Sequence, residues 1–135
     1  MRSAGIALAF LLSCLVATIA IAADLSKRVA EAKAEIATAL GAKYDEKLGP
    51  FIGEAKRSCI PPGTTAPENL GNFTFIARVG LDGKQREVEV EPSTRVATCF
   101  KGRFAAFTLP TPPGSVGSRE GTTGYPIVVE MKITP

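Results

Sequence analysis

Residues 73–91 read FTFIARVGLDGKQREVEVE, with apolar and polar side chains alternating on both sides of an Asp-Gly pair. A period of two is typical of a β-strand that buries one face. Asp82-Gly83 between two such segments is typical of a hairpin turn. The sequence therefore predicts a β-hairpin.

The register of this hairpin follows from matching side chains across a two-residue turn. Phe75 then faces Val90 on one surface, and Arg78 faces Glu87 on the other. A register shifted by one residue would place Arg78 against Arg86, so we expect the first pairing.

After the hairpin, a helix and a last strand are expected. Ser93 or Thr94 can cap the helix. Its predicted buried stripe consists of Val96, Cys99, Phe100, Phe104 and Phe107. Residues 109–114 are rich in proline and stop it, and the alternating residues 127–133 form the last strand.

Two helical stretches precede the hairpin. Apolar residues at helical spacing form the first stripe, consisting of Leu25, Val29, Ala32, Ile36 and Leu40. Gly41 is expected to end this helix. A second helix is expected over residues 43–58, with a kink or break at Gly49-Pro50.

These elements predict an α+β fold in which the last strand lies beside the first. N-terminal helices are followed by a three-stranded antiparallel sheet of order 2-1-3, with helices covering one face. The expected core consists of Phe73, Phe75, Val79, Phe100, Phe104, Phe107, Ile127 and Val129. We divide the chain into an N-terminal amphipathic helix (23–41) and an α+β domain (42–135).

Residues 1–22 are predicted to be a cleaved secretory signal peptide. One positive charge, Arg2, precedes an apolar run that ends in Ala20-Ile21-Ala22, the small residues that a signal peptidase needs. Two alternatives stay open: lipidation at Cys14, and retention of the apolar segment as a membrane anchor. Membrane attachment is expected only in these two cases.

The remaining chain of about 113 residues has the size of one domain. Its formal charge of about +2 gives no reason to expect nucleic acid as a partner. Two cysteines survive cleavage, Cys59 and Cys99, and an even count in an exported chain predicts a structural disulfide rather than free thiols. This predicts a periplasmic or secreted location.

The sequence offers no catalytic constellation. It contains no histidine, and Asp45 and Glu46 are adjacent, so they point in different directions on a helix. Ser58 has no base to activate it. We therefore predict no enzyme activity, no metal site and no cofactor, and we interpret the phenylalanine stripe as core rather than as a ligand pocket.

The layout of helix, Gly-turn hairpin, helix, proline motif and terminal strand resembles the TonB C-terminal domain, in a disulfide-bearing variant. The matching parts are Tyr44, Leu48 and Ala55, residues 75–90, residues 96–107 with 109–113, and residues 125–133. The histidine-bearing anchor and the long proline-rich spacer of the energy transducers are not matched here. What the resemblance implies is the binding mode, in which an edge strand accepts a strand of a partner protein.

The expected partner-binding edge consists of Ile127, Val128, Val129, Glu130, Met131, Lys132 and Ile133. The opposite edge carries Glu87, Glu89 and Glu91, which guard it. In the alternative interpretation, Glu130 and Lys132 protect the last strand in the same way.

The sequence thus predicts a non-enzymatic periplasmic interaction module whose partner is another periplasmic or outer-membrane protein. The alternative is a periplasmic inhibitor or immunity protein that blocks a hydrolase. Neighbouring genes would separate the two: an adjacent hydrolase gene favours inhibition, and transporter or receptor genes favour the interaction module.

Overall fold

The computed structural model describes residues 24–134, apart from 64, 68–69 and 115–123. The predicted signal peptide and Cys14 lie outside the described residues. In chain order, the described elements are a helix over residues 24–36 (the N-terminal helix), α2 (Ala39–Cys59), β1 (Gly71–Val79), β2 (Gln85–Glu91), α3 (Arg95–Ala105) and β3 (Tyr125–Ile133).

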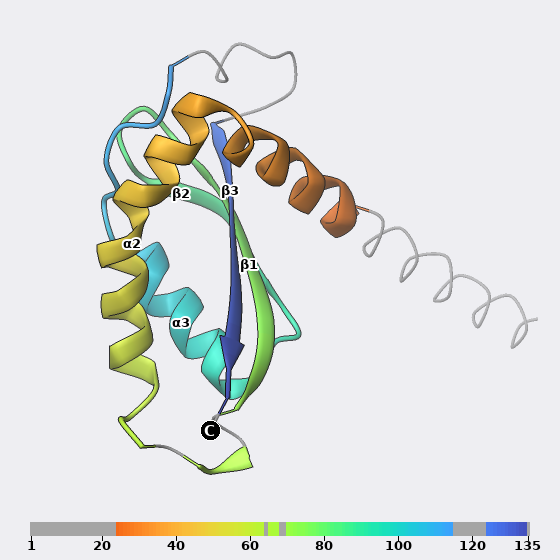
Figure 1. Cartoon of the computed structure of the whole chain (residues 1–135), viewed down its shortest axis with the longest axis vertical. Helices are drawn as coiled ribbons and strands as arrows, with labels where there is room; N and C mark the ends of the chain where they lie inside the picture. Colours follow the sequence, from red (N-terminus) through yellow and green to blue (C-terminus); the bar gives the residue numbers. More distant parts are fainter. Residues whose placement is uncertain (1–23, 64, 68–69, 115–123, 135) are drawn as a thin grey trace, which may run out of the picture.

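The three strands form one antiparallel sheet in the order β2-β1-β3, which confirms the predicted α+β fold and strand order. Figure 1 shows α2 and α3 on one side of this sheet and the N-terminal helix on the other. The described part of the chain therefore has three layers, with the sheet in the middle.

The main core lies between the sheet and the pair α2 and α3. It contains all eight predicted core residues, of which Phe107 is half-buried. Phe75 is fully buried and meets Phe104 edge to face, with ring centroids 5.1 Å apart. Phe100 stacks on Phe104 at 5.3 Å. The phenylalanine side chains at helical spacing in α3 thus pack in the core, as predicted.

A second, smaller apolar cluster lies on the opposite face of the sheet. Ala32 of the N-terminal helix packs there against Ile76 and Val128. The expectation that helices cover one face is therefore wrong for this helix. The helix packs on this face because Ile76 and Val128 are apolar residues on the side of the sheet that the strand alternation had assigned to solvent.

Ion pairs at the rim of this second cluster also hold the N-terminal helix. Arg28 lies 3.1 Å from Glu89, and Arg78 lies 3.0 Å from Glu31 and 2.9 Å from Glu87. Each arginine side chain is mostly buried, so its stem covers apolar surface while its guanidinium bridges the helix and the hairpin.

The N-terminal helix ends earlier than predicted, at residue 36. Thr38 caps α2 by accepting a hydrogen bond from the Gly41 N–H at 3.0 Å. A Cβ atom on Gly41 would lie 1.7 Å from the Glu35 carbonyl oxygen. Gly41 therefore permits a close approach of two backbones and does not end a helix, and Leu40 is 63 % exposed instead of joining the buried stripe.

The predicted break at Gly49-Pro50 is absent, because α2 runs continuously from Ala39 to Cys59 with Pro50 inside it. A proline removes the hydrogen bond to the carbonyl four residues earlier, here that of Glu46. Both Glu46 and Pro50 are exposed, so water can solvate that carbonyl and the helix continues.

The hairpin has a three-residue loop rather than the predicted two-residue turn. The Gly80 N–H donates to the Lys84 carbonyl, the Gly83 N–H donates to the Gly80 carbonyl, and Gly83 has a φ of +77°. This loop sets Arg78 opposite Arg86 next to the turn.

A β-bulge then restores the apolar pairing. Glu87 has a φ of 52° and supplies one extra residue to β2, so that Phe75 lies opposite Val90 as predicted. The bulged Glu87 also keeps its ion pair with Arg78. The predicted apolar and charged contacts thus form, although the turn type was wrong.

A disulfide joins α2 to α3, as the sequence predicts. Cys59 and Cys99 are bonded, and their Cα atoms lie 5.8 Å apart. A structural disulfide is typical of proteins in oxidising compartments.

We expect the double substitution Cys59→Ala with Cys99→Ala to lower the free energy of unfolding by about 4 kcal/mol. The reason is that the bond closes a loop with a sequence separation of 40, which restricts the unfolded chain. Urea unfolding followed by circular dichroism measures the change, with reduced wild-type protein as the control. A loss below about 1 kcal/mol would contradict a stabilising role.

We expect Gly41→Ala to lower the free energy of unfolding by about 2 kcal/mol or more, because its Cβ would collide with the Glu35 backbone. Gly102→Ala in α3 is the matched control, since its Cβ meets nothing within 4 Å. Alanine there should raise the stability by roughly 0.5–1 kcal/mol. Thermal unfolding compares the two variants, and a shift of the same sign for both would refute the close approach at Gly41.

Candidate functional site

β3 lies at an edge of the sheet, because β1 is its only hydrogen-bonded neighbour among the described strands. In the view of Figure 1, β3 runs along the middle of the molecule, between α2 and the N-terminal helix. All seven residues of the predicted binding edge lie in this strand. What the outer side of β3 can bind depends on where its main-chain groups point.

The alternation of hydrogen-bonding directions along each strand determines where the main-chain groups of β3 point. Since the Gly80 N–H bonds to Lys84 across the hairpin, even-numbered residues of β1 face β2 and odd-numbered ones face β3. β1 pairs with β3 in an unbroken register from Gly71 with Ile133 to Val79 with Tyr125. Odd-numbered residues of β3 therefore bond to β1, and even-numbered residues point their main-chain groups outward.

The outward positions begin with Pro126, which suits a residue that has no N–H to donate. The next three, Val128, Glu130 and Lys132, each present an N–H and a carbonyl outward. We call these groups the β3 edge. They form a row of unpaired donors and acceptors of the kind that accepts another strand.

The side chains of the predicted edge residues divide between the two faces of the sheet. Ile127, Val129, Met131 and Ile133 belong to the main core. Val128 packs under the N-terminal helix, and the Glu130 carboxylate lies 2.8 Å from the Lys33 ammonium of that helix. The charge of Glu130 is thus paired above the sheet face.

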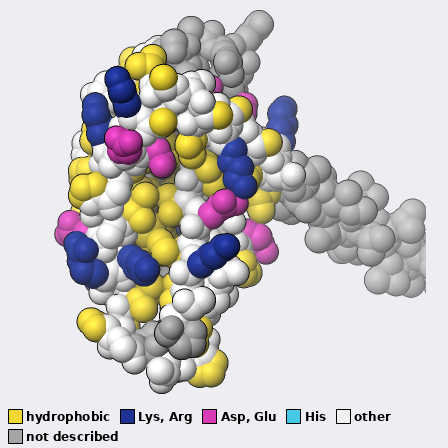
Figure 2. Space-filling model, in the orientation of Figure 1, with side chains coloured by type: hydrophobic (Ala, Val, Ile, Leu, Met, Phe, Trp, Pro, Cys, Tyr) yellow, Lys and Arg dark blue, Asp and Glu magenta, His cyan; other side chains and the backbone are white. Residues whose placement is uncertain are grey.

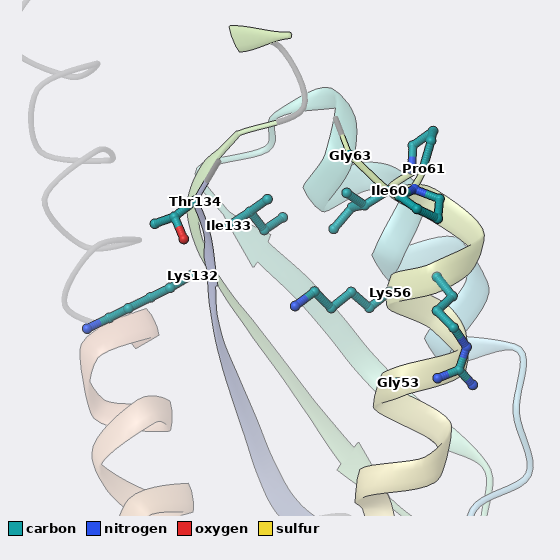
Figure 3. Close-up of a pocket in the computed structure, with 10 residues that line it drawn as sticks. Gly53, Lys56, Ile60, Pro61, Gly63, Lys132, Ile133 and Thr134 are labelled. Atoms are coloured by element: carbon teal, nitrogen blue, oxygen red, sulfur yellow. The ribbon is translucent and has the colours of Figure 1, made fainter. Parts of the chain in front are cut away.

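A hollow of about 470 Å³ lies between the end of α2 and the end of β3. Ile60, Pro61 and Ile133 give it apolar walls, and Lys56 is the lysine that α2 contributes. Figure 3 shows the Lys56 side chain reaching from α2 across this space, with Ile60 and Ile133 pointing into it. We call it the cationic hollow.

A second hollow, of only about 10 Å³, lies where α2 and β3 begin. Its lining includes Tyr44 and Leu48 from α2 and Tyr125 and Ile127 from β3. The two hollows lie at opposite ends of the surface between the two elements, and we call this surface the α2–β3 groove. Figure 2 shows hydrophobic side chains along the middle of this face, with charged side chains on either side.

Sequence reasoning missed the contribution of α2 and of the segment after it. The predicted site residues include none of Lys56, Pro61 and Pro62, all of which line the cationic hollow. One sequence signal could have indicated this part of the site. Ile60 is an apolar residue followed by two prolines, which restrict the conformation of the chain beside it.

The two tyrosines of the chain meet at the narrow end of the groove. Their rings lie edge to face with centroids 5.2 Å apart. The Tyr44 hydroxyl donates to the Pro110 carbonyl at 2.8 Å, whereas the buried Tyr125 hydroxyl has no hydrogen-bond partner among the described residues. Both tyrosine side chains are buried.

Burial sets the protonation of this pair. It raises the pKa of Tyr44 to about 12, with a further rise from Tyr125. Burial likewise raises the pKa of Tyr125 to about 12, and the charges of Glu35 and Asp45 add to the rise. Burial and then Glu46 also raise the pKa of Asp45. Both phenols are neutral at neutral pH, so they support packing and not proton transfer.

No cluster of three His, Cys, Asp or Glu side chains that could hold a metal ion occurs within the described residues. Of the described helices, none combines the length and the apolarity needed to cross a membrane. Comparison of the chain with protein-family models, with curated proteins and with solved structures finds no match. Function is therefore inferred from the β3 edge and the α2–β3 groove themselves.

We expect the folded protein to lose stability as the pH rises from about 10 to about 12. Unfolded tyrosines ionise near pH 10, whereas Tyr44 and Tyr125 keep their protons until about 12, so the stabilisation is complete below pH 10 and is lost through the folded pKa. The ultraviolet absorbance of phenolate measures the ionisation of the two tyrosines in the folded protein, and no tryptophan adds to the signal. The control is Tyr125→Phe, in which the signal reports Tyr44 alone. Ionisation of both groups near pH 10 in folded protein would contradict their burial.

Proposed function

We propose that this chain is a non-enzymatic interaction module of the periplasm, and that it binds an extended segment of another periplasmic or outer-membrane protein as a fourth strand along β3. The observation that carries the proposal is the β3 edge, whose outward N–H and carbonyl groups have no described partner. Strand addition satisfies such groups by main-chain pairing.

The charges around β3 support this edge over the other one. Glu130 is engaged by Lys33 over the face of the sheet, and Lys132 is the other charged residue of the strand. β2 is bulged at Glu87, and this residue and Glu89 are tied to arginines, a combination that discourages pairing. β3, whose register with β1 is unbroken, is thus the more regular template.

The α2–β3 groove supplies what main-chain pairing lacks, namely selectivity. Alternate side chains of an added strand would point into the groove, towards the apolar walls at Ile60 and Ile133. In strand addition, main-chain hydrogen bonds give affinity and such side-chain pockets give specificity. An edge next to a groove is therefore better suited to a particular partner than an edge alone.

Two further observations support the proposed compartment. The Cys59–Cys99 disulfide fits an oxidising space, and the N-terminal sequence has the features of an export signal. The resemblance to the TonB C-terminal domain favours the periplasm among such spaces. The absence of histidine from the sequence favours binding over catalysis, because histidine is the most frequent general base.

We expect peptides selected from a random displayed library against the oxidised protein to bind along β3. In the free protein, the amides of Val128, Glu130 and Lys132 should exchange with solvent faster than those of Val129 and Met131, which bond to β1. A selected peptide should slow the exchange of the first three. Amide hydrogen exchange followed by NMR measures both states.

Two variants of one position isolate the main-chain contribution. Glu130→Pro removes an outward N–H and should weaken peptide binding about tenfold or more. Glu130→Ala loses the same exposed ion pair to Lys33 but keeps the N–H, so it should change the dissociation constant less than about threefold. Equal binding to the two variants, or amides of the β3 edge already protected in the free protein, would refute the proposal.

A further inference from the structure

Lys56 is a cation without an ion-pair partner among the described residues. Lys56, Arg57 and Lys132 all line the cationic hollow. Within the described part of the chain, no carboxylate side chain lines this hollow, and none of the three cations forms an ion pair. Figure 3 shows that Lys132 points towards the other face of β3, whereas Lys56 extends into the groove. Lys56 is therefore placed to meet a side chain of an added strand.

The level of Lys56 along β3 follows from two hollows that the elements share. Leu48 lines the narrow hollow together with Ile127, and Ile60 lines the cationic hollow together with Ile133. α2 and β3 thus run in the same direction, as Figure 1 shows. From Leu48 to Ile60 the helix rises about 18 Å over twelve residues, and from Ile127 to Ile133 the strand rises about 20 Å over six residues. The two elements therefore cover nearly the same distance between the two hollows.

Between these ends, each turn of α2 meets one alternate residue of the strand. Positions four apart on the helix are separated by about 6 Å, and alternate strand residues by about 6.8 Å. Ile52 therefore lies at the level of Val129, and Lys56 at the level of Met131. The groove presents in succession an apolar, a cationic and an apolar position, the last formed by Ile60.

An added strand that runs antiparallel to β3 would match this order. Antiparallel pairing is slightly more stable than parallel pairing, and it is how β1 already pairs with β3. Residues opposite Val129, Met131 and Ile133 would stand at non-hydrogen-bonded positions, where side chains of neighbouring strands approach most closely. These are the partner residues that face the groove.

Given the proposed function on which it rests, we propose that the partner segment carries an acidic side chain opposite Met131, recognised by Lys56, with apolar side chains two residues before and two residues after it. The partner is thus an extended segment of pattern apolar-x-acidic-x-apolar. Lys56 is exposed, so a carboxylate there would form a solvent-screened ion pair beside the apolar walls of the hollow. The apolar residues would occupy the positions next to Ile60 and Ile52.

The test uses three synthetic peptides, Thr-Val-Thr-Glu-Thr-Val-Thr and its twins with Gln or Lys in place of Glu, each with a fluorescent label and a soluble Gly-Ser tail. Fluorescence anisotropy measures their dissociation constants for the oxidised wild-type protein, Lys56→Gln, Lys56→Glu, the control Lys47→Gln, and Glu130→Pro. Lys47 lies on the same helix and does not line the hollow. Circular dichroism checks that each variant folds.

We expect the wild type and Lys47→Gln to bind the Glu peptide about twofold to fivefold more tightly than the Gln peptide, and the difference to shrink as salt is added. The preference should vanish in Lys56→Gln and turn towards the Lys peptide in Lys56→Glu. If the Glu and Gln peptides bind the wild type equally, or if Lys56→Gln keeps the preference, the acidic pattern is wrong. In that case, loss of binding in Glu130→Pro still upholds strand addition, whereas failure of all three peptides to bind overturns both proposals.

Discussion

The position of α2 depends on its attachment to α3, and the disulfide between Cys59 and Cys99 makes that attachment covalent. α3 packs on β1 and β2 through Phe100 and Phe104, and α2 packs on α3. α2 is therefore held mainly from the side of the hairpin, and it contacts β3 where both elements begin, through Tyr44 and Tyr125. The groove beside the β3 edge is the space that this arrangement leaves.

The N-terminal helix complements this arrangement from the other face. It covers Ile76 and Val128. Its Arg28 pairs with Glu89 of the hairpin, and Arg78 of the hairpin pairs with Glu31 of the helix. Strands buried on both faces are stiff, since their side chains are fixed by packing on two sides. β3 consequently presents its outer main chain from a rigid support, which lowers the entropic cost of adding a strand.

Strand order, the core stripe of α3 and the disulfide were all predictable from sequence, because each depends on periodicity or on counting. The turn type was not, since Asp82-Gly83 fits both a two-residue and a three-residue loop, and the bulge at Glu87 compensates for the difference. The edge residues 127–133 were predictable as a strand. The groove was not, because Lys56 and Ile60 approach β3 only through the tertiary position of α2.

The bulge in β2 has a consequence for assembly. An extra residue with a φ of 52° twists this strand and disrupts the spacing of its outer hydrogen-bonding groups. Under the proposed strand addition, the sheet would grow on the β3 side and not on the β2 side. One copy of this protein would then end the enlarged sheet, which makes stoichiometric capture compatible with a soluble, non-fibrillar product.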